Sequence, residues 1–352
     1  MDPGRQVPAH GAGGDDCVNV KNGRNWDTPV KQVDVFINVF GKPYQTALSL
    51  LSLMRYCNKY IDKIYFHLEP ATFELERRDH SSLIRYLKDM IIVYNIPYWL
   101  STDPTDEKRF LFDEQYRLSL RYQYGFENTD KQFALIIHND IEVIDDILGK
   151  MLTEIHDATA IGKIGQCWWC PAGQTGLCSS KKYTEFKPAY SQLMFIYNKD
   201  MDYSERRAYN LGLRQEFQKN PWPLPECRVN EWCMLVNMHK ARPATFPFGN
   251  AAPIGALFAS GAKIGETWED DVTLDTGVQW FRDLNHLGHT FTDFPVEKSV
   301  IHDRRGNVAL YNDELYIRNE MQAKEKLLHN FHDAYTKIFI SRQLPAPPGG
   351  SA

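Results

Sequence analysis

The segment Phe133–Asp145, with the sequence FALIIHNDIEVID, joins an apolar run to three polar residues, His138, Asn139 and Asp140. A near-continuous apolar run predicts a strand that is buried on both faces of a sheet. In open α/β sheets, ligands bind outside the carboxyl ends of the strands. There Asp140 could hold a hard divalent cation that bridges a diphosphate, and His138 and Asn139 could hydrogen-bond a ribose or a phosphate. The alternative for these residues is the N-cap of a helix that begins near Ile141.

Two other predicted strands also end in groups that suit a nucleotide. The strand at 33–40 leads into a short loop before a helix, and its end carries Asn38 and Phe40. Backbone N–H groups of such a loop could face a nucleotide. The strand at 61–69 ends in Glu69, which could bind a base or a ribose hydroxyl, or could be a solvated carboxylate at the sheet edge. The loop lacks the glycine patterns of dinucleotide-binding Rossmann folds and of P-loops, which disfavours both classes.

Alternating strands and helices must position these residues. In the first half we predict strands at 33–40, 61–69, 91–100 and 131–138, separated by helices at 42–60, 79–90 and 108–125. This order predicts an α/β fold with a doubly wound, mostly parallel sheet. In the second half we expect a loop at 165–182, a strand at 191–198, a helix near 203–219, loops at 244–266, a helix at 275–288, strands near 289–302 and a terminal helix at about 312–340.

The composition excludes several classes of protein. The net charge of -5 gives no sign of the basic stripe of a nucleic-acid-binding protein. No apolar run approaches the ~20 residues of a membrane helix, and the N-terminus lacks the apolar segment of a secretory signal. Seven cysteines in such a chain favour free thiols or a metal site over disulfides. We therefore expect a cytoplasmic protein without a transmembrane segment, and peripheral association with a membrane stays open.

The order of elements, with HND at 138–140 after the fourth strand, resembles the GT-A fold of nucleotide-sugar-dependent glycosyltransferases. In that fold a short acidic motif, D-x-D, follows the fourth strand and binds metal and diphosphate; HND keeps only the last Asp. The segment 275–302 is similar to inverting, family-two-like GT-A enzymes, in which an Asp at a helix start is the base and a later His binds the metal. The resemblance implies Asp275 as base, and Asp140 and His302 as ligands of Mn²⁺ or Mg²⁺.

Each of these residues also has a structural alternative. Asp275 could be an N-cap at the positive end of its helix, and His302 a partly buried, hydrogen-bonded imidazole. Glu231 is a second candidate base because Trp232 beside it could stack on a sugar; otherwise it is a solvent-facing helical residue. Arg117 and Arg121, one helical turn apart, could contact the phosphates of the departing nucleoside diphosphate, or could be surface arginines.

The cysteines allow three interpretations. Cys167 and Cys170 form a C-x-x-C pair, and Cys178 and Cys227 could complete a structural Zn²⁺ site. The same thiols could instead be buried and free, or could form a redox pair. A zinc ion with four thiolates would have no open position, so it would shape the acceptor side without taking part in the chemistry.

The resemblance to GT-A enzymes implies a metal-assisted glycosyltransferase that moves a hexosyl or related sugar from a nucleotide-sugar donor to a carbohydrate or glycolipid hydroxyl, as in polysaccharide biosynthesis. We expect flexible tails at 1–29 and 342–352 around one domain at 30–341, with a nucleotide-sugar-binding half at 30–145 and an acceptor-side half at 146–341. Two alternatives stay open. One is a non-catalytic carbohydrate-binding or scaffold protein, because the first Asp of D-x-D is missing. The other is a retaining transferase, because inversion rests on Asp275 alone.

Overall fold

The computed structural model describes residues 32–69, 79–100, 104–168, 170–199, 215–263, 271–302 and 313–340. The predicted tails at 1–29 and 342–352 lie outside these residues, as does most of the helix predicted near 203–219. Within the described residues, the main sheet has seven strands in the order β10-β6-β7-β4-β1-β2-β3. Its strands are β1 Val33–Val39, β2 Ile61–Leu68, β3 Ile91–Asn95, β4 Phe133–His138, β6 Ala160–Ile164, β7 Val229–Asn237 and β10 Phe291–Asp293.

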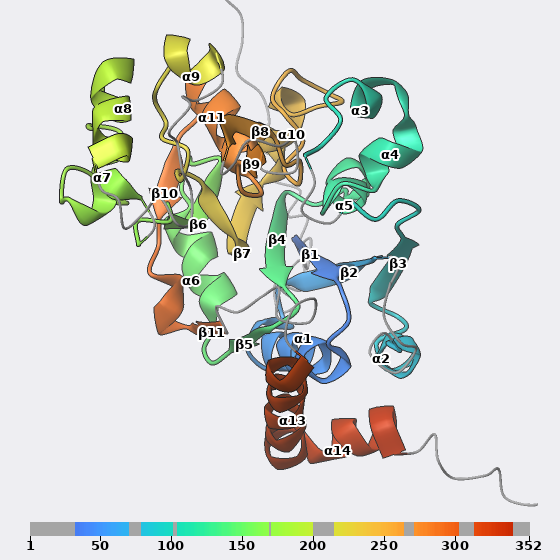
Figure 1. Cartoon of the computed structure of the whole chain (residues 1–352). Coiled ribbons are helices and arrows are strands. Elements are labelled where there is room, and N and C mark those ends of the chain that lie inside the picture. Colours follow the sequence, from blue (N-terminus) through green and yellow to red (C-terminus); the bar gives the residue numbers. More distant parts are fainter. Residues whose placement is uncertain are drawn as a thin grey trace, which may run out of the picture. The chain divides into compact units, whose positions relative to one another are not determined.

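The sheet is mostly parallel. Strand β1 pairs parallel with β2 and β4, β2 pairs parallel with β3, and β10 pairs parallel with β6. Only β7 runs antiparallel to its two neighbours, β4 and β6. Helices flank this sheet (Figure 1), so the predicted α/β fold class with a mostly parallel sheet is confirmed.

Alternate residues of the central strands enter two hydrophobic cores. Val35 and Ile37 of β1 pack with helices α1 Pro43–Cys57 and α6 Ile147–Glu154, whereas Phe36 faces the core that contains Phe126 and Trp280. All of these side chains are buried. Burial on both faces explains the near-continuous apolar sequence of these strands. In register, Asn38 lies opposite both His67 and His138, so the carboxyl ends of β1, β2 and β4 meet at one edge.

The C-terminal helix stabilises the start of α1. Helix α13, Asp313–Asn330, lies beside α1 (Figure 1). The buried carboxylate of Glu320 accepts hydrogen bonds from the backbone N–H groups of Tyr44 at 2.9 Å and Gln45 at 3.0 Å. Free N–H groups at a helix start need such acceptors, so Glu320 caps α1 from another part of the chain. The predicted terminal helix continues as α14, His332–Tyr335, and the π-helical turn η5, Thr336–Ile340.

The remaining elements are short. They are α2 Ser81–Tyr86, β5 Ile141–Val143, α7 Pro171–Gln174, α9 Gln215–Lys219, α10 Met238–Ala244, β8 Ala259–Lys263, β9 Asp271–Thr273, α11 Val278–His286, η4 Val296–Lys298 and β11 Val300–His302. Two antiparallel pairs, β11 with β5 and β8 with β9, lie outside the main sheet. None of the helices in the described ranges has both the length and the hydropathy needed to cross a bilayer.

Several predictions of secondary structure are wrong, and the loops expected at 165–182 and 244–266 contain α7 and β8. The segment predicted as a strand at 191–198 belongs to helix α8, Tyr190–Lys199. The helix predicted at 108–125 is divided into α3 Arg109–Phe112, α4 Glu114–Leu118 and α5 Gln123–Asn128. The breaks occur because Asp113 is extended and caps α4, and because Tyr122 adopts the left-handed conformation. Glu231 lies in strand β7, not in a helix.

Candidate active site

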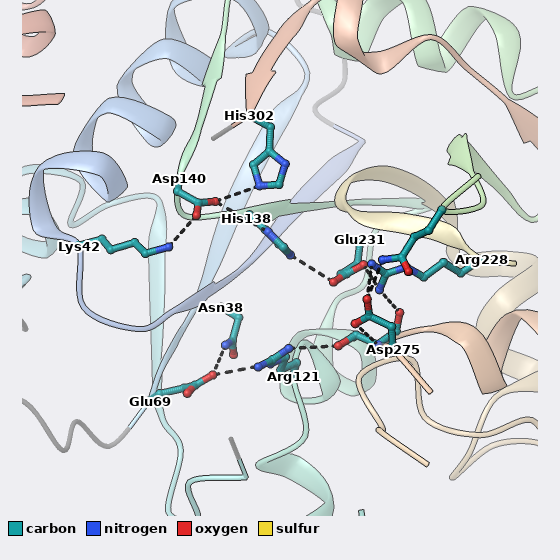
Figure 2. Close-up of polar contacts among 12 residues, drawn as sticks. Asn38, Lys42, Glu69, Arg121, His138, Asp140, Arg228, Glu231, Asp275 and His302 are labelled. Carbon is teal, nitrogen blue, oxygen red and sulfur yellow. Dashed lines mark hydrogen bonds and ion pairs between the residues drawn. The ribbon is translucent and has the colours of Figure 1, made fainter. Parts of the chain in front are cut away.

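Two histidines surround Asp140 at the carboxyl end of β4. His138 is the last residue of β4, and His302 ends β11, which pairs antiparallel with β5 so that His302 lies opposite Ile141. Asp140 Oδ1 is 3.3 Å from His302 Nε2 and 3.8 Å from His138 Nδ1. Among the described residues, these three form the only group of three or more His, Cys, Asp or Glu side chains whose ligand atoms all lie within 4.8 Å of one another. Figure 2 shows both imidazoles directed toward this carboxylate.

This triad fits a divalent cation. Asp140 Oδ1 and His302 Nε2 are buried and make no hydrogen bond, although they lie close together. Buried polar atoms are normally paired, and a cation between these atoms would satisfy both. One carboxylate oxygen and two imidazole nitrogens form a ligand set that first-row divalent metals accept. The sequence predicts Asp140 and His302 for this role, and predicts that His138 contacts the nucleotide.

Asp140 is ionised despite its burial. Burial raises the pKa of Asp140, but the charge of Lys42 and the two imidazoles outweigh burial and hold that pKa well below its usual range. The carboxylate is therefore ready to bind a cation. Ile141 begins a strand, not a helix, so the N-cap interpretation of this segment is wrong.

Lys42 is a residue of the site that the sequence analysis missed. Its Nζ atom lies 2.6 Å from Asp140 Oδ2, and the two side chains are only 7% and 4% exposed. Asn139, which the sequence predicts to contact the nucleotide, donates hydrogen bonds to the Gly41 carbonyl at 3.3 Å and the Thr46 hydroxyl at 3.2 Å. Asn139 thus holds the loop that carries Lys42. In the sequence, the only indication that Lys42 belongs to the site was the predicted proximity of its loop to a nucleotide.

A line of polar contacts joins the triad to both candidate bases (Figure 2). His138 Nε2 lies 3.3 Å from Glu231 Oε1, and Arg228 Nη1 lies 2.6 Å from Glu231 Oε2. Arg228 Nη2 then lies 3.0 Å from Asp275 Oδ2, which also accepts a hydrogen bond from Gln166 Nε2 at 2.7 Å. Burial alone would raise the pKa of Glu231. Arg228 and His138 outweigh burial and lower this pKa to about 2. Arg228 is therefore a buried cation shared by two carboxylates.

The two candidate bases differ in access to solvent. The Glu231 side chain is 4% exposed and lies between His138 and Arg228, whereas the Asp275 side chain is 31% exposed. Helix α11 begins at Val278 and has Gly277 at its N-cap. The Asp275 carboxylate accepts a hydrogen bond from the N–H of Thr276, outside the helix, so the N-cap interpretation of Asp275 is wrong.

A second cluster lies at the ends of β1 and β2. Asn38 Nδ2 and Trp99 Nε1 donate hydrogen bonds to the Glu69 carboxylate, the latter at 3.1 Å. Phe40 stacks on Trp99 with ring centroids 5.9 Å apart. Arg121 Nε lies 3.9 Å from Glu69 Oε1. The cluster therefore offers an aromatic face beside polar groups, and of its members only Trp99 was not predicted.

Arg121 also links the two clusters, because its Nη1 atom donates a hydrogen bond to Thr276 Oγ1, next to Asp275, at 3.1 Å. Arg117 does not share its position. It lies in α4 and makes a bidentate pair with Glu127, at 2.8 Å and 3.1 Å. The expectation that the two arginines lie one turn apart on the same helix is wrong, because α4 ends at Leu118.

The four cysteines of the predicted zinc site are free. They are not among the groups of described residues whose ligand atoms are close enough to hold a metal. Burial raises the pKa of all four thiols, that of Cys178 to about 11. Because the four thiols do not converge in the described part of the chain, their geometry does not support the predicted zinc site.

No protein-family model and no curated protein matches this chain. Solved structures similar to it include a mannosyltransferase, PcManGT from Pyrobaculum calidifontis in complex with GDP-Man and Mn²⁺, at 8% identity and a TM-score of 0.40, over 86% of this chain and 69% of that chain. Another is glucosyl-3-phosphoglycerate synthase from Mycobacterium tuberculosis in complex with Mn²⁺, UDP and phosphoglyceric acid, at 10% identity and a TM-score of 0.37, over 85% and 78%. A third is S. aureus TarS 1-349, at 9% identity and a TM-score of 0.28; the match covers 38% of this chain and 36% of the TarS chain.

Proposed function

We propose that this chain is a GT-A-type glycosyltransferase that moves a sugar from a nucleoside-diphosphate donor to an acceptor hydroxyl with the help of a divalent cation. One observation carries the proposal. A cation-binding triad around Asp140 is joined, through His138, Glu231 and Arg228, to the partly exposed carboxylate of Asp275. Charge neutralisation and a base are the two functions that such a transfer needs.

The two clusters would bind different parts of the donor. His138, Asp140 and His302 would hold the cation, which when bound would neutralise negative charge on the diphosphate. Asn38, Phe40, Glu69 and Arg121, with Trp99, would hold the nucleoside, because they combine a stacking face with polar groups. Both clusters lie at the carboxyl ends of parallel strands, where open α/β sheets bind ligands.

Asp275 is the better candidate for the base. Both oxygens of Glu231 already have charged or polar partners, and its side chain is almost fully buried. Asp275 is more exposed, and Gln166 and Arg228 hold its Oδ2 atom in one orientation. A carboxylate so placed can take the proton of an acceptor hydroxyl as the sugar is transferred. A single displacement of this kind inverts the anomeric carbon, so we propose an inverting enzyme. The acceptor is a carbohydrate or glycolipid hydroxyl.

The histidines affect the choice of metal. Imidazole nitrogens suit first-row transition metals better than Mg²⁺, which prefers an all-oxygen set. We therefore propose that Mn²⁺ binds more tightly than Mg²⁺. A set of two imidazoles and one carboxylate also binds Fe²⁺ in non-haem iron sites, so Fe²⁺ belongs in the same comparison.

A thermal-shift screen tests the proposal. The purified protein is heated with UDP, GDP and their sugar conjugates, with and without Mn²⁺, Mg²⁺ or Fe²⁺. We expect at least one nucleotide to raise the Tm only when Mn²⁺ is present, and Asp140→Asn to abolish this effect. Release of nucleoside diphosphate from the stabilising nucleotide sugar is then measured with acceptor saccharides. No stabilisation by any combination of nucleotide and metal would contradict the proposed function.

A further inference from the structure

Lys42 places a buried positive charge against the only carboxylate of the triad. Its Nζ atom lies 2.6 Å from Asp140 Oδ2. Figure 2 shows Lys42 and His302 approaching Asp140 from different sides. The two carboxylate oxygens are thus divided: Oδ2 faces the ammonium group, and Oδ1 faces both imidazoles. A cation at the triad would have Oδ1 as its carboxylate ligand.

The backbone at Lys42 is unusual for a lysine. Gly41 and Lys42 follow one another with φ of 61° and 59°, in the left-handed region that favours Gly and Asn. The conformation is held in place, because the N–H of Thr46 donates to the Lys42 carbonyl at 2.8 Å and Asn139 binds the Gly41 carbonyl. Strained backbone persists only where surrounding contacts hold it, and such positions are enriched at active sites and ligand-binding sites.

Within the described part of the chain, the charge of Lys42 opposes that of Asp140 at the triad. Asp140 contributes one negative charge, and Lys42, with its Nζ atom 2.6 Å from Asp140 Oδ2, contributes one positive charge. The carboxylate of Glu231, which contacts His138, is paired with Arg228 at 2.6 Å. Glu320 also interacts with the charge of Lys42, but its oxygens accept hydrogen bonds from the start of α1. A divalent cation alone would therefore meet little net negative charge here.

We infer that Lys42 is a positioning residue that keeps the triad from holding a divalent cation by itself and makes metal binding depend on the diphosphate of the nucleotide. This inference rests on the proposed function. The diphosphate supplies the negative charge that Asp140 and Lys42 together do not. Metal and nucleotide then bind cooperatively, since each provides charge that the other needs.

The test measures Mn²⁺ binding, not activity. The free-Mn²⁺ signal in electron paramagnetic resonance gives the Kd for Mn²⁺ alone and in the presence of UDP or GDP. Lys42→Asn and Lys42→Met remove the charge, and Asn suits the left-handed backbone; Lys42→Arg retains the charge. Lys131→Met is the matched control. Lys131 also pairs with a carboxylate, because its Nζ atom lies 2.8 Å from Asp62 Oδ2, but this pair is not at the strand ends that carry the triad. Thermal unfolding with and without Mn²⁺ is recorded for each variant.

For the wild type we expect nucleotide to tighten Mn²⁺ binding by about tenfold or more. In Lys42→Asn and Lys42→Met, Mn²⁺ alone should bind about tenfold more tightly, because one repelling charge is removed, and the effect of nucleotide should shrink. A variant destabilised by the loss of Lys42 should recover its Tm with Mn²⁺, whereas Lys42→Arg and Lys131→Met should resemble the wild type. Unchanged or weaker binding of Mn²⁺ alone in both neutral variants, with nucleotide-dependent binding intact in the wild type, would overturn the inference and leave the proposed function standing. No binding of Mn²⁺ and nucleotide to the wild type would overturn both.

Discussion

Asp140 Oδ1 and His302 Nε2 lie 3.3 Å apart because two short strands outside the main sheet bring these side chains together. Strand β5 begins directly after Asp140, and β11 ends at His302, with Ile141 and His302 in register. The ring of Trp232, from β7, stacks on His302 with centroids 5.0 Å apart and planes inclined by 13°. The candidate metal ligands are thus fixed by a strand pair and by an aromatic contact from the main sheet.

The first prediction concerns this contact. His302→Ala should weaken nucleotide-dependent Mn²⁺ binding by at least about tenfold, because one ligand is lost. Trp232→Leu should weaken it by up to about tenfold, since outer-sphere contacts orient metal ligands. Electron paramagnetic resonance of free Mn²⁺ measures both, and Trp280→Leu serves as a control, because Trp280 is a buried tryptophan of the other hydrophobic core. If Trp232→Leu binds Mn²⁺ as the wild type does, the stacking contact has no part in orienting His302.

Part of this site could be predicted from the sequence because it follows strands with a strong pattern. The apolar runs that end at Asn38, Glu69 and His138 indicated buried strands, and parallel strands bring their carboxyl ends to one edge. These strands are buried on both faces, as Val35, Phe36 and Ile37 show. Their sequences are therefore almost continuously apolar, which makes the strands easy to predict.

Other features depend on contacts that a sequence does not display. The run at 191–198 suits a strand or a helix, since short apolar runs have no decisive period. Glu231 and Asn230 interrupt a buried strand, and they are tolerated there because Arg228 and backbone carbonyl oxygens partner them. Lys42 is a charged residue in a conformation that favours glycine, and its burial makes sense only beside Asp140.

The second prediction separates the two candidate bases. Asp275→Asn should lower kcat for sugar transfer by about 10²–10⁴-fold, the usual contribution of a general base, while the affinity for Mn²⁺ and nucleotide stays within about twofold. Glu231→Gln should act differently, because Glu231 contacts both His138 and Arg228 and should change metal affinity as well as kcat. Steady-state kinetics and binding measurements on both variants decide the assignment. Near-wild-type kcat in Asp275→Asn would exclude Asp275 as the base.

The third prediction concerns the cap of α1. Glu320→Ala should lower the free energy of unfolding by about 2 kcal/mol, because the N–H groups of Tyr44 and Gln45 lose their acceptor in a buried place. Glu320→Gln retains an acceptor oxygen and should cost less. Glu325→Ala, at an exposed position of the same helix, is the control. Urea unfolding measures all three, and equal stability of Glu320→Ala and Glu325→Ala would show that the cap contributes nothing.

The fourth prediction is a pH dependence of stability that comes from His67. This side chain is buried, the N–H of Tyr122 donates to its Nδ1 atom at 3.1 Å, and burial lowers the pKa of His67 to about 3. In the unfolded chain the imidazole binds a proton below pH about 6.5, whereas in the folded chain it does not until pH about 3. The unfolded state therefore binds more protons between these values, and stability falls as the pH falls.

From pH 7 to pH 5 this difference should lower the free energy of unfolding by about 2 kcal/mol. His80 acts in the same direction, because burial lowers the pKa of His80 to about 4. Urea unfolding at pH 7, 6 and 5 should therefore give a smaller slope with pH for His67→Gln than for the wild type, whatever the baseline stability of the variant. His332→Gln, at an exposed position, should keep the wild-type slope. An unchanged slope in His67→Gln would mean that the folded protein protonates His67 as readily as the unfolded chain does.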